Sequence, residues 1–170
     1  MDRLILLLAR GGGLGLAPKA PGTVGTLGGY PLTLLFLVPG NFWVYLGACV
    51  LLVPLSAWIC GEAERILERE DPGEVVFDEI IAVPMCFLGV FALMEFQGGG
   101  MPDLESVLSY KLWWAWALGG FGIFRVFDIW KPGPIDKAQS LRGGWGVTMD
   151  DVLAGLLSGA ILGGVYYGLQ

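Results

Sequence analysis

The sequence predicts an all-α membrane protein, a compact bundle of about four to five membrane helices with a polar site at one membrane surface. Hydrophobic residues make up 55% of the 170 residues and charged residues 15%, and the mean hydropathy is +0.66. Soluble domains carry about 25% charged residues. Five apolar runs follow one another, and the charged clusters lie at their ends. The length predicts one domain over residues 1–170.

The first part of the chain predicts one surface segment and two helices. Leu4–Ala9 is too short for the apolar core of a signal peptide and no cleavage site follows it, so we expect an interfacial helix that stays in the mature chain. The run Leu27–Val38 ends at the turn signal Pro39-Gly40-Asn41 and is short enough to be re-entrant. Phe42–Cys60 is long enough to span about 30 Å of hydrocarbon.

Three further runs follow. Ile80–Phe96 contains Pro84, and Glu95 lies near its far end; the last two runs are Leu112–Phe127 and Val152–Leu169. Each is at or slightly below the roughly 17–25 residues that a membrane helix needs. Several soluble core helices in succession would fit this composition poorly, so we expect these runs to be membrane helices.

Alternating the direction of the runs places the charged clusters on one side. That side then holds Glu62, Asp78-Glu79, the segment from Arg125 to Lys131, and Asp150-Asp151. Nine of the ten Lys and Arg residues fall there, and Lys111 is the exception. Because cytoplasmic loops of membrane proteins are enriched in Lys and Arg, we expect this site to face the cytosol.

Two acidic pairs are the main sign of a metal site. Asp78-Glu79 and Asp150-Asp151 each stand where an apolar run begins, and such carboxylates are costly to desolvate unless they are paired or bound to a cation. Helix capping is the alternative, but it explains one acid of a pair better than two. Hard cations such as Mg²⁺ prefer oxygen ligands, so the pairs favour a divalent-metal site.

Two segments could bind an anion. In the glycine-rich stretch from residue 11 to 26, Lys19 supplies a charge, and Thr23 and Thr26 can donate hydroxyls or cap a helix that begins near Leu27. The second segment, residues 124–135, carries Arg125, Asp128 and Lys131. Arg125 suits bidentate contact with a phosphate, with Lys131 as a second contact, but Arg125 could equally pair with Asp128 three residues away.

Composition also excludes several chemistries. The chain has no His, and Cys49, Cys60 and Cys86 lack any ligand spacing, so we expect buried, reduced thiols. There is no basic stripe for nucleic acid. The charges from Glu64 to Glu70 predict a solvated helix, in which Glu64 pairs with Arg65 or Arg69.

Four motifs resemble the phosphatidylglycerophosphatase A family. They are residues 18–27 (PKAPGTVGTL), 76–79 (VFDE), 124–132 (FRVFDIWKP) and 149–155 (MDDVLAG), in the order and spacing of that family. Two positions depart from it: Ala82 stands where Gly is usual, and Gly133 where an aromatic residue is expected. The resemblance covers about residues 11–164. It implies a bacterial inner-membrane enzyme that hydrolyses phosphatidylglycerophosphate to phosphatidylglycerol and phosphate with Mg²⁺, whose partners are that substrate and membrane lipids.

Elimination narrows the mechanism to metal-assisted hydrolysis, because the nucleophile motifs of cysteine, histidine and haloacid-dehalogenase phosphatases are absent. We expect Mg²⁺ ligands among Glu62, Asp78, Glu79, Asp150 and Asp151, and catalytic roles for Asp78, Asp128, Asp150 and Asp151. Phosphate-binding residues would be Lys19, Thr23, Thr26, Arg125 and Lys131. Asp128 would act as general base or orient Arg125. Water attack and an aspartyl-phosphate intermediate both stay open. The alternative function is a membrane cation transporter or a carboxylate-lined ion-binding protein.

Overall fold

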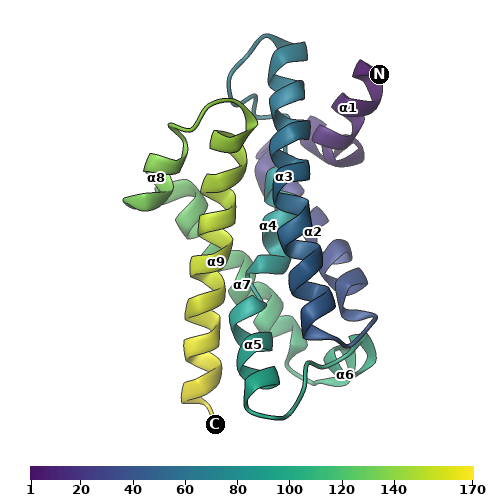
Figure 1. Ribbon diagram of the computed structural model, residues 1–170, viewed down its shortest axis with the longest axis vertical. Coiled ribbons are helices and arrows are strands. Elements are labelled where there is room, and N and C mark those ends of the chain that lie inside the picture. Colours follow the sequence, from purple (N-terminus) through teal and green to yellow (C-terminus); the bar gives the residue numbers. More distant parts are fainter.

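The computed structural model describes residues 1–170 and contains only helices and their connections, which confirms the all-α class (Figure 1). The long helices lie side by side in an elongated bundle, with α1 near one end and the C-terminus at the other. The elements are α1 (Asp2–Ala9), the 3₁₀ helix η1 (Gly11–Leu16), α2 (Pro21–Leu37), α3 (Phe42–Leu67), α4 (Phe77–Met85), α5 (Leu88–Phe96), α6 (Leu104–Ser109), α7 (Trp113–Trp130), α8 (Pro134–Ala138) and α9 (Gly144–Gly168).

Three helical segments are long and apolar enough to cross a membrane: Phe42–Leu67, Phe77–Phe96 and Gly144–Gly168. They contain the second and third predicted runs and all of the fifth except Leu169, while the first and fourth runs lie in α2 and α7 except for one end residue each. The outer face of α3 stays apolar, since Val50 is 60% and Leu51 72% exposed. Soluble proteins rarely expose such a face, so the bundle is that of a compact helical membrane protein.

The third predicted run forms two helices, because the chain breaks between α4 and α5. Pro84 has no backbone N–H and cannot continue the helical ladder of α4. The Cys86 N–H then donates to the Val83 carbonyl in a tighter turn, at 3.0 Å. The buried Tyr45 hydroxyl of α3 donates to the Pro84 carbonyl at 2.7 Å, so a backbone group at the break keeps a partner inside the bundle.

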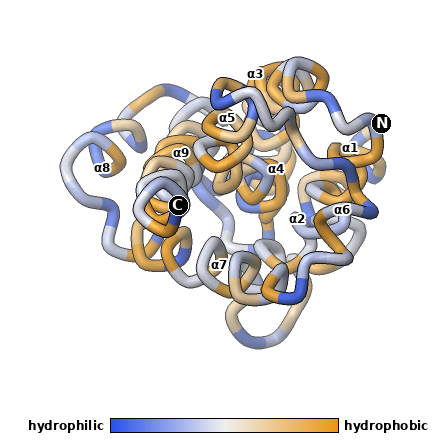
Figure 2. The backbone as a smooth tube through the Cα atoms, turned by 90° about the horizontal axis from the view of Figure 1, so that it is seen from below, coloured by the Kyte–Doolittle hydropathy of each residue, from blue (hydrophilic) through white to orange (hydrophobic).

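Helix α4 is the centre of the bundle. It contacts α2, α3, α7 and α9, which surround it in the view along the bundle axis (Figure 2). Every residue from Ile80 to Met85 is buried, and the main apolar core extends from there to Tyr45, Phe91 and Phe124. Because α4 is enclosed on all sides, any polar group in its first turn must find partners on its neighbours.

Glycines bring α9 very close to α4. A Cβ atom at Gly155 would lie 2.8 Å from the Ala82 carbonyl oxygen, and one at Gly159 would lie 2.7 Å from the Met85 carbonyl oxygen. Small residues four positions apart allow membrane helices to pack backbone against backbone. This contact places the start of α9 beside the start of α4. It also accommodates Ala82, whose side chain is fully buried.

The N-terminal half of the fold agrees with most of the predicted boundaries. The Asn41 side chain caps α3 by accepting from the Trp43 and Val44 N–H groups, as the turn signal indicated. Helix α1 forms as predicted and buries Ile5 and Ala9, of which Ala9 packs against the end of α3. Helix α2 instead begins at Pro21, six residues before Leu27, which changes the roles of the threonines in its first turns.

Candidate active site

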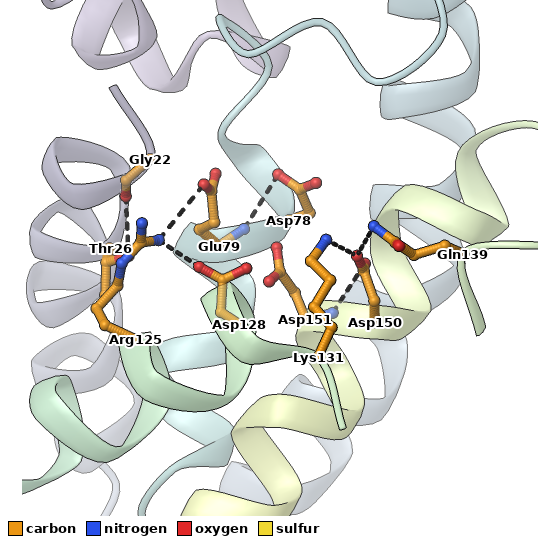
Figure 3. A network of polar contacts seen from close by, with 10 residues as sticks. All are labelled: Gly22, Thr26, Asp78, Glu79, Arg125, Asp128, Lys131, Gln139, Asp150 and Asp151. Atoms are coloured by element: carbon orange, nitrogen blue, oxygen red, sulfur yellow. Dashed lines mark hydrogen bonds and ion pairs between the residues drawn. The ribbon is translucent and has the colours of Figure 1, made fainter. Parts of the chain in front are cut away.

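Acidic and basic side chains from three helices meet where α4 and α9 begin and α7 ends (Figure 3). Asp78 and Glu79 lie in the first turn of α4, and Asp150 and Asp151 lie in the second turn of α9. Arg125 and Asp128 come from the last turns of α7, and Lys131 is its C-cap. These are the charged ends of three predicted runs. Alternating the direction of the runs therefore correctly predicted that these residues lie close together.

Asp78, Glu79 and Asp151 form the tightest group, which we call the carboxylate cluster. One carboxylate oxygen of each lies within 4.8 Å of the other two. Asp78 and Asp151 are both buried. Glu79 Oε2 and Asp151 Oδ1 are inaccessible to solvent and have no hydrogen-bond partner. Three close carboxylates with unsatisfied oxygens repel one another unless a cation joins them. Their oxygen donors fit a hard divalent cation.

Arg125 is the nearest cation to this cluster. Its Nη1 atom donates to Asp128 Oδ2 in a short contact and lies 3.9 Å from Glu79 Oε1. The i, i+3 ion pair considered from the sequence therefore forms. The same guanidinium also faces the cluster, and its Nε atom is buried without a partner. Arg125 thus has donor capacity left for an anion.

Asp150 lies beside the cluster but has other partners. Its Oδ2 atom accepts from Lys131 Nζ at 2.5 Å and from Gln139 Nε2 at 3.1 Å. Partial burial lowers the pKa of the Lys131 ammonium, but the hydrogen bond to Asp150 and the nearby carboxylates outweigh burial and raise it above its ordinary value. Lys131 has a left-handed backbone, with φ 47°, which is strained for a residue with a side chain. The strained backbone conformation of Lys131 occurs at the position where its ammonium group forms the ion pair with Asp150.

Three of the predicted site residues have other partners in the structure. Asp150 lies beside the group of three close carboxylates, and its oxygens accept from Lys131, Gln139 and the Asp151 N–H. Glu62 is outside it as well, since its Oε2 accepts two hydrogen bonds from Arg65. Thr26 is fully buried and its hydroxyl donates to the Gly22 carbonyl at 2.8 Å, so it is not free to donate to a phosphate or to cap α2.

The start of α2 lies against the cluster. A Cβ atom at Gly22 would be 2.2 Å from Glu79 Oε1 and 3.3 Å from Arg125 Nη1. Thr23 is half-buried in this first turn, and Lys19 just before it is exposed without an ion pair. The first N–H groups of a helix have no partner within it and attract anions. This turn can therefore contribute to an anion site near Glu79 and Arg125.

Some polar contacts at this end were not anticipated. Gln139 gave no signal in the sequence, because a single amide in a loop has no periodicity or motif to distinguish it. Ser56 and Thr148 are fully buried and hydrogen-bonded to each other at 3.0 Å, which ties α3 to α9 one turn before Asp151.

Two predictions made outside the site have clear outcomes. Arg65 pairs with Glu62, so the pairing predicted for Glu64 is wrong; Glu64 accepts from the Asp71 N–H. The three cysteines are buried and free, as predicted.

Comparison with known proteins gives a consistent picture. The family model described as "Phosphatidylglycerophosphatase A" matches residues 7–166. A protein of that name from Escherichia coli (strain K12) is 32% identical over 161 residues, covering 92% of this chain and 80% of the relative. One from Haemophilus influenzae is 33% identical over 164 residues, covering 96% and 89%.

A relative from Bacteroides thetaiotaomicron carries a different name, "Putative phosphatidylinositol-3-phosphatase". It is 35% identical over 159 residues, which cover 91% of this chain and 89% of the relative. No solved structure matches the chain. The two names share the substrate class of lipid phosphomonoesters and differ in the headgroup.

Proposed function

The chain belongs to the phosphatidylglycerophosphatase A family and is a phosphatase, and from this premise we propose that it hydrolyses phosphatidylglycerophosphate with Mg²⁺ at the cytosolic face of a bacterial inner membrane. The carboxylate cluster is the observation that carries the proposal. Asp78, Glu79 and Asp151 supply three oxygen donors in reach of one ion, and two buried carboxylate oxygens lack any other partner. Mg²⁺ accepts this kind of donor set and keeps further positions for water and phosphate.

When bound, Mg²⁺ supplies positive charge that stabilises the phosphoryl group and makes a water molecule more acidic. The chain itself supplies the cations on either side. Arg125 faces the cluster from α7, and Lys131, the C-cap of that helix, pairs with Asp150 beside the cluster. Both are held in place by carboxylates, Asp128 and Asp150, so little side-chain entropy remains to be lost when a phosphate binds. Thr23 and Lys19, at the start of α2, complete the phosphate-binding side.

In the proposed reaction a water oxygen forms a bond to phosphorus, and the bond between phosphorus and the glycerol oxygen breaks. Asp128 binds Arg125 through Oδ2, which leaves its Oδ1 to take the proton of the water. The glycerol oxygen takes a proton from solvent and leaves as the hydroxyl of phosphatidylglycerol, phosphate is released, and Asp128 returns its proton to solvent. Direct attack by water forms no phosphorylated protein, so none should be detected when a reaction run in ¹⁸O-water is chemically quenched. A trapped phospho-aspartate would instead establish attack by a carboxylate of the chain.

The main test measures phosphate release from phosphatidylglycerophosphate by the purified protein, with and without Mg²⁺. We expect release only with Mg²⁺, and almost none from Asp151→Asn. Glu62→Gln is the matched control, because Glu62 is a carboxylate on the same side that pairs with Arg65. Phosphatidylinositol 3-phosphate belongs in the same assay because of the Bacteroides relative's name. No release under any condition, or full activity of Asp151→Asn, would overturn the proposal.

The position of the cluster favours an enzyme over a cation transporter. Transporters hold their coupling ions near the membrane midplane. Asp78 and Glu79 are in the first turn of α4, and Asp151 is in the second turn of α9, so the cluster is close to the ends of both segments. Ion flux through proteoliposomes at rates exceeding phosphate release would contradict this choice.

The excess of Lys and Arg at this end supports a cytosolic orientation. Two exposed positions test it, Arg142 in the loop before α9 and Lys111 in the α6–α7 connection. In spheroplasts, a membrane-impermeant thiol reagent should label Lys111→Cys and not Arg142→Cys. The native cysteines are buried and provide a low background. The opposite labelling would place the site on the outer face.

A further inference from the structure

Gln139 is a polar residue at the edge of the site that the hydrolysis itself does not use. It lies between α8 and α9, outside the carboxylate cluster, and its Nε2 atom donates to Asp150 Oδ2 at 3.1 Å. The same oxygen holds Lys131. Gln139 is therefore linked through one carboxylate to a cation that faces the phosphate position, although it carries no charge of its own.

The backbone around Gln139 is held tightly. Ile135 is 2% and Ala138 8% exposed, so the short helix α8 is anchored by buried side chains. A Cβ atom at Gly146 would lie 2.7 Å from the Gln139 carbonyl oxygen, which means that the loop rests directly on the first turn of α9. The side chain thus projects from a fixed point, although its surface is exposed.

The partner of Gln139 also determines which way its amide points. The Asp150 carboxylate, paired with Lys131, can only accept hydrogen bonds, so the amide NH₂ must face it. The amide oxygen, Oε1, is then turned elsewhere, and no group of the chain donates a hydrogen bond to it. An oriented acceptor at the edge of a phosphate site suits a donor on the substrate, such as a hydroxyl group.

The order of the side chains places Gln139 beyond the phosphate. Figure 3 shows Arg125 at one side, the carboxylate cluster in the middle, then Lys131 with Asp150, and Gln139 at the other side. A phosphate bound between Arg125 and Lys131 leaves Gln139 next to the group esterified to it. Ile129 and Trp130, the last residues of α7 and next to Lys131 in the sequence, are exposed apolar side chains that can meet the lipid.

We propose that Gln139 determines headgroup specificity, its amide oxygen accepting a hydrogen bond from the free hydroxyl of the glycerol that carries the phosphate. This rests on the proposed function, because that hydroxyl is a feature of phosphatidylglycerophosphate. Phosphatidic acid has no such hydroxyl. A headgroup with hydroxyls next to its phosphate can use the same acceptor. Gln139 is thus a residue that distinguishes lipid phosphomonoesters by their alcohol.

The test combines a change in the protein with a change in the substrate. The probe is an analogue in which 1,3-propanediol replaces the headgroup glycerol, so that only the hydroxyl is missing. The wild-type protein should hydrolyse phosphatidylglycerophosphate with a kcat/KM about three- to tenfold above that for the analogue, the usual range for one hydrogen bond. In Gln139→Ala and Gln139→Met this ratio should fall to about one. Loss of the Gln139 hydrogen bond to Asp150 lowers hydrolysis of both substrates alike, so the readout is the ratio and not the rate on the analogue.

Gln97→Ala is the matched control, since Gln97 is an exposed glutamine that hydrogen-bonds Gln170 at the opposite end of the bundle. It should keep the wild-type ratio. An unchanged ratio in the Gln139 variants, whatever the loss of rate on both substrates, would assign Gln139 to supporting Asp150 and overturn the inference while the proposed function stands. Equal use of both substrates by the wild type would overturn it as well. No hydrolysis of either by the wild type refutes the proposed function and the inference with it.

Discussion

The two acidic pairs of this protein have similar sequence contexts and different roles. Asp78-Glu79 and Asp150-Asp151 both lie near the start of an apolar helix that packs in the bundle. Both members of the first pair join the carboxylate cluster. The second pair divides, with Asp151 in the cluster and Asp150 bound to Lys131 and Gln139. A pair of acids is therefore a reliable sign of a polar site and a poor guide to which oxygens share an ion.

Helix geometry explains the difference. Adjacent residues of an α-helix point about 100° apart, so two neighbouring carboxylates reach one ion only if it lies between their directions. Helix α4 is enclosed by its neighbours, and both of its acids meet groups of the site. In α9, Asp151 faces α4 while Asp150 is turned toward the C-cap of α7 and the loop after α8. The neighbouring helices therefore give the two acids of the second pair different partners.

The comparison between the two acidic pairs is tested most strongly by substituting Asp151. Asp151→Asn should lower kcat by about 10³-fold, because it removes the negative charge and one carboxylate oxygen from the cluster. The free energy of unfolding without Mg²⁺ should rise, since repulsion among the buried carboxylates is relieved. Thermal unfolding should show that Mg²⁺ raises the Tm of the wild type and not that of the variant. A variant that is stabilised by Mg²⁺ like the wild type would remove Asp151 from the metal site.

The α4 pair can be disturbed without changing a carboxylate. A Cβ atom in Gly22→Ala would meet Glu79 Oε1 and force that side chain to move. We expect activity to fall by about 10²-fold, the effect of misplacing a catalytic group by about an ångström. Gly47→Ala is the matched control, because Gly47 is a helical glycine with open space around it. Equal activity of Gly22→Ala and the wild type would show that the cluster does not depend on the position of Glu79.

Asp150→Asn should have a smaller effect. The amide keeps one acceptor for Lys131 but loses the charge that holds it, so we expect kcat/KM to fall by about tenfold, mainly through KM. The apparent affinity for Mg²⁺, measured from the Mg²⁺ dependence of the Tm, should stay close to that of the wild type. A loss of Mg²⁺ affinity as large as in Asp151→Asn would return Asp150 to the metal ligands and make the two pairs equivalent.

Glu62→Gln should have the smallest effect. Glu62 pairs with Arg65, whose side chain is 64% exposed, and such pairs contribute little to stability. We expect activity and Mg²⁺ affinity to stay within about twofold of the wild type. A large loss of Mg²⁺ affinity would extend the metal site to α3, where the sequence had placed a possible ligand.

The sequence predicted the architecture well because the signals involved are cumulative. Apolar runs and their charged ends sum over many residues, and nearly all of the runs became helices with the expected direction. Boundaries were predicted less accurately. Pro84 was visible as a helix breaker, but the tight turn at Cys86 that divides the third run was not, because it also depends on the Tyr45 hydroxyl of another helix. The early start of α2 at Pro21 likewise reassigned Thr26 from the site to the Gly22 carbonyl.

The sequence by itself determined the helical membrane class, the family, and the gathering of acids and cations at one end of the bundle, since composition, motif order and run direction are properties of the chain alone. Only the tertiary structure decided that Asp78, Glu79 and Asp151 share one cluster, that Asp150 holds Lys131, and that Gln139 belongs to the site. The physical reason is that side-chain partners depend on how helices are rotated and how closely they approach. In this protein those quantities depend on contacts such as Gly155 against Ala82, between residues far apart in sequence.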